Sequence, residues 1–162
     1  MTTRTITFDD AEALAYLGQL AAKLGDLTPV MQDLGEYLVV STKSRFASST
    51  APDGTPWAAN SLTTLARYGR MYKGASKAVA GKKPLIGESR RLSGEIHAVS
   101  TSTSVTVGSS LVYAGVQQFG AGKGTLGSRS PWGDIPARPY LGLSTADRGN
   151  VLAIVREYLA GD

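Results

Sequence analysis

The chain has 162 residues and a net charge of +4, with no cysteine and a single histidine, His97. This length suits one domain with a modest core, so we expect residues 1–162 to form a single domain. The absence of cysteine excludes disulfides, thiolate metal sites and cysteine nucleophiles, and no stretch approaches the roughly 18 apolar residues that a membrane-spanning helix needs.

Two helices are predicted near the N-terminus. Residues 9–24 place apolar side chains at helical spacing after two aspartates in the first turn, where carboxylates favour the helix dipole. The second helix is predicted to begin after Thr28, an N-cap candidate followed by Pro29, and to end near Arg45 or Phe46. Its predicted apolar face carries Val30, Leu34, Tyr37, Leu38 and Ser41.

A long basic segment follows, at about residues 47–90. Its first part is dense in turn-forming residues, and a short helix fits residues 61–72. Residues 73–83 are Gly, Ala and Lys apart from Ser76 and Val79, a composition that buries little apolar surface. We therefore predict a flexible excursion, and such long loops inside compact domains tend to be functional.

A hairpin and a short helix are predicted next. Residues 92–108 carry strand-forming side chains on both sides of a turn at residues 101–103, which indicates two antiparallel strands. Residues 111–119 suit a short helix that ends at Gly120.

The last elements complete the predicted fold. Residues 135–143 indicate a third strand or an extended segment, and a helix capped by Ser144 or Thr145 is predicted to run through Leu159. The sequence therefore predicts an α+β fold. N-terminal helices precede a small antiparallel sheet with a long basic loop, and the C-terminal helix packs on the sheet.

The basic charge of the chain is concentrated in its middle. Residues 1–42 hold two basic residues against six acidic ones, residues 43–91 hold ten against two, and residues 92–162 hold five against five. The middle excess attracts phosphate backbones or acidic protein surfaces, although a solvated loop kept soluble by its charge has the same composition. The candidates for contact with a neighbouring subunit or DNA are Arg67, Arg70, Lys73, Lys77, Lys82, Lys83, Arg90 and Arg91.

Two further residues are interface candidates. Trp57 places an apolar ring in a polar loop, so the ring either docks on its own domain or meets a neighbouring subunit. We expect Arg138 to pair with a carboxylate, on its own chain or on a neighbouring subunit. We expect Pro136 and Pro139 to hold this segment in an extended path, with Tyr140 attaching it to the core.

The sequence contains no catalytic, cofactor-binding or metal-binding constellation. His97 lies in a predicted strand, and no Gly-x-Ser-x-Gly elbow is present. Residues 122–125 resemble a phosphate loop only superficially, because a glycine separates the lysine from the threonine. We therefore expect neither an enzyme nor a bound cofactor.

Four segments, in order, resemble the phage virion morphogenesis family, the Mu-like group that includes tail-completion proteins of tailed phages and prophages. The likeness covers about residues 30–160. The chain departs from the family at residues 88–92, where Glu-Ser-Arg-Arg-Leu stands in place of Asp-Thr-Gly-Arg-Leu and a residue able to adopt positive φ is missing. The segments are residues 52–57; residues 83–86 with Leu92 and Ile96; residues 107–109 with Tyr113, Ala114, Gln118, Phe119 and Gly120; and residues 135–142 with Asp147.

The resemblance implies a structural virion protein of the tail or neck. It implies a ring-forming subunit, expected to be a hexamer, that completes the tail at its head-proximal end and helps to join it to the head. The implied partners are further copies of itself, the tail tube and the head–tail connector, with assembly in the host cytoplasm. The basic segment would then face genomic DNA in the lumen or an acidic neighbour. The alternative is a free DNA-binding module that uses residues 67–91.

Overall fold

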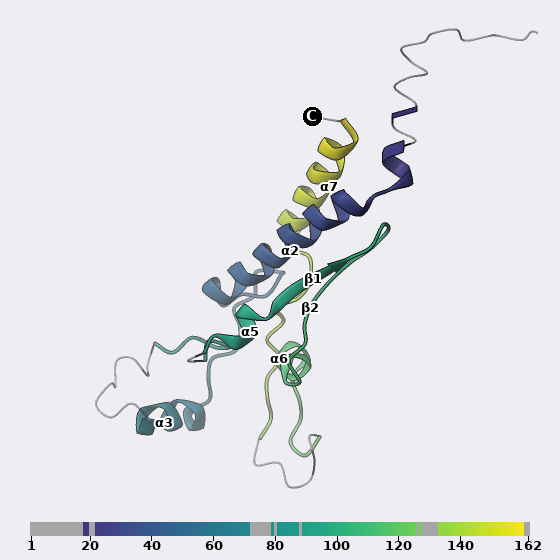
Figure 1. Ribbon diagram of the computed structural model, residues 1–162. Coiled ribbons are helices and arrows are strands. Elements are labelled where there is room, and N and C mark those ends of the chain that lie inside the picture. Colours follow the sequence, from purple (N-terminus) through teal and green to yellow (C-terminus); the bar gives the residue numbers. More distant parts are fainter. Residues whose placement is uncertain are drawn as a thin grey trace, which may run out of the picture.

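The computed structural model describes residues 18–19, 22–71, 79, 81–87, 89–125, 127 and 133–160. Most of the predicted first helix, at residues 9–24, lies outside these ranges. The molecule is elongated, with α2 and α7 towards one end and α3 and α6 towards the other (Figure 1). The elements are α2 (Thr28–Ser48), α3 (Leu62–Met71), α5 (Arg91–Gly94), β1 (Ile96–Ser100), β2 (Val105–Ser109), α6 (Ala114–Phe119) and α7 (Thr145–Ala160).

Helix α2 is the central helix of the fold. The Asp26 carboxylate accepts the Thr28 N–H at 2.9 Å. Hydrogen bonding to the Thr28 side chain, and then to its backbone N–H, lowers the pKa of Asp26. Thr28 is therefore the first helical residue and not the N-cap that the sequence predicts; Leu27 takes the cap position without a side-chain bond. The helix ends where Ser49 adopts a left-handed conformation and its N–H bonds the Arg45 carbonyl.

The sheet is a two-stranded antiparallel hairpin that packs against α2. Ile96 pairs with Ser109 and Ser100 with Val105, so the hairpin begins later than predicted, because residues 91–94 form the short helix α5. Gly35 permits the helix to approach closely, since a Cβ there would lie 3.0 Å from the Ala98 Cβ. The Ser100 hydroxyl also donates to the Met31 carbonyl at 2.9 Å.

Helix α7 begins with a capping box. The Ser144 hydroxyl accepts the Asp147 N–H at 3.0 Å, and the Asp147 carboxylate accepts the Ser144 N–H at 2.8 Å, so two terminal donors are satisfied reciprocally. Ser144 is thus the cap, one of the two residues predicted. The α+β class is confirmed, but α7 packs against α2 and not on the sheet as predicted, because α2 covers the hairpin face and separates the two.

The core lies under the C-terminal half of α2. The Phe46 ring meets the Trp57 ring edge-on, with centroids 5.4 Å apart, and the Tyr140 ring at 5.3 Å. Residues 135–143 provide one side of this core as an extended segment, and their ladder is limited to a single bridge between Ile135 and Ala121. The other buried members of the cluster are Ala51, Leu92, Ile96 and Ala114.

Candidate functional site

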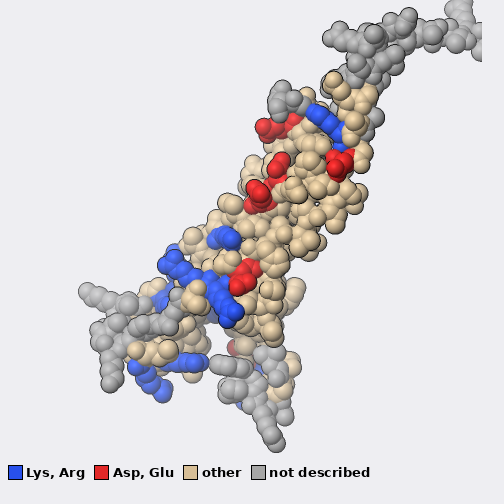
Figure 2. Space-filling view, viewed as in Figure 1, with Lys and Arg blue, Asp and Glu red and all other residues tan. Residues whose placement is uncertain are grey.

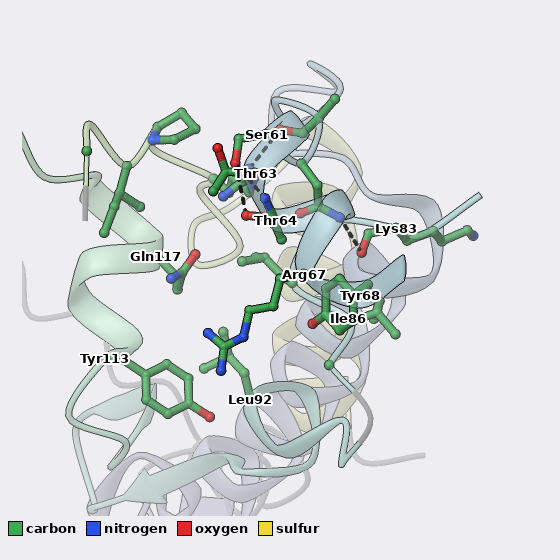
Figure 3. Close-up of a pocket in the computed structure, with 18 of the residues that line it drawn as sticks. Ser61, Thr63, Thr64, Arg67, Tyr68, Lys83, Ile86, Leu92, Tyr113 and Gln117 are labelled. Carbon is green, nitrogen blue, oxygen red and sulfur yellow. Dashed lines mark hydrogen bonds between the residues drawn. The ribbon is translucent and has the colours of Figure 1, made fainter. Parts of the chain in front are cut away.

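A broad groove of about 1130 Å³ opens beside α3 (Figure 3). One wall is α3 itself, and the other is built from α5, α6 and the extended segment near Pro136. Its lining is mixed, since cationic side chains stand beside apolar ones. We call this the basic groove; its principal lining residues are Arg67, Arg70, Leu85, Ile86, Arg91, Leu92, Tyr113, Gln117 and Pro136.

The arginines of the groove have no acidic partner among the described residues. Arg67 projects across the groove, so that its guanidinium lies between Tyr113 and Leu92 (Figure 3). Arg67, Arg70 and Arg91 are exposed, and within the described ranges the chain forms a single ion pair, which involves none of them. A guanidinium without an internal partner is available for a carboxylate or phosphate from outside.

The lysines beside the groove are held differently. The Lys82 ammonium lies 4.8 Å above the centre of the Tyr68 ring, a cation–π contact. The Lys83 ammonium donates to the Ala47 carbonyl at the end of α2. Arg90 is exposed and precedes α5 in a left-handed conformation (φ 48°), the place where the family motif has glycine. Lys73 and Lys77 lie outside the described residues.

Helix α3 is attached to the rest of the molecule by few contacts. It buries none of its residues. Its N-terminus is capped by Ser61, whose hydroxyl accepts the Thr64 N–H at 3.2 Å, and the Asn60 amide just before it donates to the Lys82 carbonyl at 2.9 Å. Because apolar burial contributes so little here, α3 is expected to open locally at a lower free energy than α2.

A second group of residues holds the extended segment 135–143, part of which lines the groove, in place. Trp57 is buried, and its indole N–H donates to the Pro139 carbonyl at 2.7 Å. The ring therefore lies within its own chain, the first of the two placements considered for it. The loop before it is closed by a bond from the Trp57 N–H to the Ser49 carbonyl at 2.9 Å, so residues 49–57 form a tight turn at the start of the predicted excursion.

Arg138 is an anchor and not an exposed contact. Only 7% of it is exposed, and its guanidinium donates to the carbonyls of Ala58 and Ala59 at 2.8 and 2.9 Å. The partner expected from the sequence was a carboxylate; the structure supplies backbone carbonyls, because residues 58–59 run alongside the extended segment. Burial lowers the pKa of Arg138.

Tyr140 and Gln118 tie the extended segment to α6. Tyr140 is 1% exposed, and its hydroxyl donates to the Ala114 carbonyl at 3.2 Å. Burial raises the pKa of Tyr140. The Gln118 side chain accepts the N–H groups of Tyr140 and Leu141 at 3.0 Å each and donates to the Leu141 carbonyl at 3.1 Å. One amide thus replaces the ladder that a neighbouring strand would supply.

Gly120 allows the chain to turn beside this segment. Its φ is 75°, and a Cβ at this position would lie 2.8 Å from both the Ala137 nitrogen and the Ile135 oxygen. Only glycine fits such an approach. Two aromatic residues of the same motif lie outward: Phe119 is 80% exposed and Tyr113 is 44% exposed.

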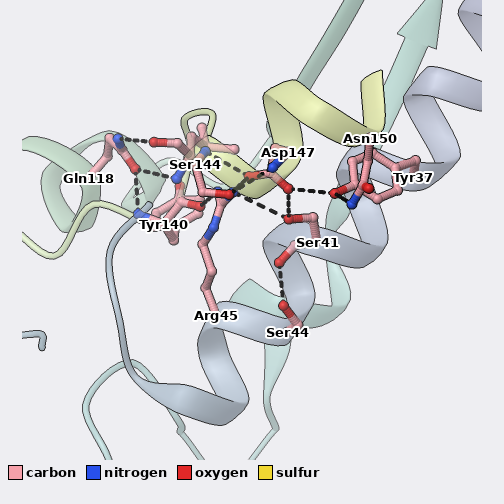
Figure 4. A network of polar contacts seen from close by, with 10 residues as sticks. Tyr37, Ser41, Ser44, Arg45, Gln118, Tyr140, Ser144, Asp147 and Asn150 are labelled. Atoms are coloured by element: carbon pink, nitrogen blue, oxygen red, sulfur yellow. Dashed lines mark hydrogen bonds and ion pairs between the residues drawn. The ribbon is translucent and has the colours of Figure 1, made fainter. Parts of the chain in front are cut away.

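A buried polar network joins α2, α7 and the extended segment (Figure 4). The Arg45 guanidinium forms an ion pair with Asp147 and donates to the Tyr140 carbonyl at 2.8 Å. Asp147 also accepts bonds from the hydroxyls of Ser41, Ser144 and Tyr37. Burial disfavours the charged carboxylate, but the bonds from Ser144, Ser41 and Tyr37 outweigh it and hold the pKa of Asp147 well below its usual range.

Sequence reasoning did not identify this network. Tyr37, Ser41 and Arg45 recur every four residues, so they lie on one face of α2. The available signal was the cation Arg45 in line with the apolar stripe of the helix. Only the fold brings Asp147, which is 102 residues away in sequence, to Arg45.

Comparison with known protein families assigns the chain to a family. A model of the phage virion morphogenesis family matches residues 8–160. The chain belongs to this family. Comparison with curated proteins and with solved structures gives no match. The resemblance inferred from the four motifs is therefore confirmed, and the protein has a role in forming the phage virion.

The motifs that resemble the phage virion morphogenesis family converge in the structure. The turn at residues 52–57, helix α6 and the run 135–142 surround the core beneath Phe46, and Asp147 joins them to α2. What these motifs encode is a rigid frame. The groove arginines, by contrast, lie at the edge of this frame and have no acidic partner in the part of the chain that the structure describes.

Other kinds of site find little support in the described part of the chain. No group of three or more His, Asp or Glu side chains there is arranged to hold a metal ion. Among the same residues, no helix has the length and apolar character needed to cross a bilayer.

Proposed function

We propose that this protein is a structural subunit that forms a ring at the head-proximal end of the tail, where it completes the tail and helps to join it to the head. The observation that carries the proposal is the family match over residues 8–160. A groove whose arginines have no acidic partner among the described residues fits a protein that acts by contacting neighbours. The proposed partners are other copies of the chain, in a hexameric ring, together with the tail tube and the head–tail connector.

The proposal is tested by assembly. Full-length protein would be examined by native mass spectrometry and electron microscopy, alone and after mixing with the tail-tube and connector proteins of the same phage. Immunogold labelling of virions would locate the chain on the particle. We expect a closed ring and label at the head–tail junction. A chain that stays monomeric with every partner, or label confined to the distal tail tip, would contradict the proposal.

The second candidate is a DNA-binding module that uses residues 67–91. It is favoured by Arg67 and Arg70, which form no ion pair within the described ranges. In that case the isolated protein binds duplex DNA, and its affinity falls steeply with salt. Each phosphate contact contributes about 0.9 to the slope of log affinity against log salt. Arg67→Ala with Arg70→Ala would then lower the slope by about 2. An unchanged slope would dispose of this candidate.

A further inference from the structure

We propose that the basic groove receives the exposed acidic face of α2 from a second copy of this chain. The acidic face consists of Asp33 and Glu36, with Asp26 just before the helix and Val40 one turn beyond. The inference rests on the proposed function, because it names the two surfaces through which ring subunits would meet.

The groove is chemically suited to an acidic helix with some apolar character. Its cationic residues, Arg67, Arg70 and Arg91, lack an acidic partner in the described ranges. Between them lie apolar side chains, of which Leu85 and Ile86 are half-buried. Guanidinium groups pair with carboxylates in bidentate fashion, and the apolar lining accepts an aliphatic side chain from the same occupant.

The acidic face of α2 has the complementary pattern. Asp33, Glu36 and Val40 are spaced three and four residues apart and therefore share one side of the helix. All three are exposed, and Val40 is 66% exposed, which is high for a valine in a helix that otherwise carries the core. Neither Asp33 nor Glu36 pairs with a cation among the described residues.

The two surfaces lie in different parts of an elongated molecule. Acidic atoms gather mainly over the half that holds the start of α2, whereas basic atoms gather at the end that carries α3 and α5 (Figure 2). A chain whose opposite charges are separated in this way satisfies them by meeting the next copy head to tail. Such a heterologous contact closes into a ring when the rotation between copies permits.

This occupant accounts for more of the observations than DNA does. A nucleic-acid backbone would satisfy the arginines, but it leaves Leu85, Ile86 and the exposed Val40 without a role. A second copy uses both the cations and the apolar positions. It also explains why Asp33 and Glu36, which pair with no described cation, lie on one face of α2. Opposite charges at the two surfaces would additionally set the register and suppress wrong contacts.

The test reverses the charge of each surface. One variant carries Arg67→Glu and Arg70→Glu, the other carries Asp33→Arg and Glu36→Arg. Self-association of each full-length variant is measured by sedimentation velocity and native mass spectrometry. Because like charges then face each other, we expect each variant alone to associate more than about tenfold more weakly than the unmodified chain.

An equimolar mixture of the two variants provides the decisive measurement. Each reversed groove then meets a reversed face on the other variant, so the mixture should regain association with the two kinds of copy alternating. Arg156→Glu and Glu95→Arg are matched controls, since both residues are exposed and neither lines the groove. Circular dichroism verifies that every variant is folded.

The outcomes separate this inference from the proposed function. Rings that are unaffected by both reversals, or a mixture that fails to regain association, would overturn the inference and leave the ring proposal in place. Loss of DNA binding with intact self-association in the arginine variant would assign the groove to nucleic acid instead. An unmodified chain that never associates would contradict both proposals.

Discussion

Arginine has opposite roles in two regions of this molecule. Arg45 and Arg138 are buried, and each donates to partners fixed by the fold. Arg67 and Arg70 are exposed on α3, a helix without a buried residue, and have no acidic partner in the described part of the chain. The first pair joins segments distant in sequence, whereas the second is left available. The difference teaches that position in the fold, and not residue type, decides which arginines are held by partners within the described part of the chain.

The largest expected effect comes from breaking the buried pair. Asp147→Asn removes the carboxylate and leaves the Arg45 guanidinium buried without a counter-charge. We expect a loss of about 4 kcal/mol in the free energy of unfolding. Urea denaturation followed by circular dichroism measures it. A loss below about 1 kcal/mol would mean that the pair contributes no more than a surface ion pair.

The close turn at Gly120 should come next. Gly120→Ala introduces a Cβ 2.8 Å from two backbone atoms at a positive φ, so we expect a loss of about 3 kcal/mol. Gly124→Ala is the matched control, because its φ is also positive (86°) but no atom lies within 4 Å of the added Cβ. It should lose only about 1 kcal/mol, the cost of an L residue in the left-handed region. Equal losses would show that backbone strain alone, and not contact with the extended segment, sets the cost.

Acid should weaken the buried network through Asp147. The pKa of Asp147 is lowered in the folded state, so its contribution is fully present above the unfolded pKa of about 3.9 and is lost as pH falls below that value. The stability difference between the unmodified chain and Asp147→Asn should therefore be about 1 kcal/mol smaller at pH 3 than at pH 7. Paired denaturation curves at the two pH values measure this. If the stability difference is the same at both pH values, the charge of Asp147 is not what stabilises the fold.

The smallest effect is expected at the groove. Arg67→Ala with Arg70→Ala removes side chains that are exposed and unpaired with any described acid, so the free energy of unfolding should change by less than about 0.5 kcal/mol. Thermal unfolding of the isolated chain checks this. A larger loss would show that these arginines stabilise their own subunit, and the comparison between the two regions would fail.

Much of the local structure was predictable from the sequence. The long helix, the short helix at 62–71, the hairpin and the last helix all follow from periodicity, strand-forming residues and caps. The boundaries were less accurate. Thr28 is the first helical residue, with Leu27 at the cap position and the Asp26 side chain accepting the Thr28 N–H. Residues 91–94 form a helical turn ahead of the hairpin. In both places a short-range alternative competed with the expected pattern.

For the candidate site, the sequence predicted that cations would gather there but not which of them would be exposed. The sequence by itself determined the family, the α+β class and the basic excess between residues 43 and 91, because motifs, periodicity and charge are properties of the chain. The tertiary structure alone decided which cations are structural. It brings Asp147 to Arg45 and the carbonyls of residues 58–59 to Arg138, while it leaves Arg67 at an open groove. Burial and partners depend on contacts between distant segments, and no local pattern records them.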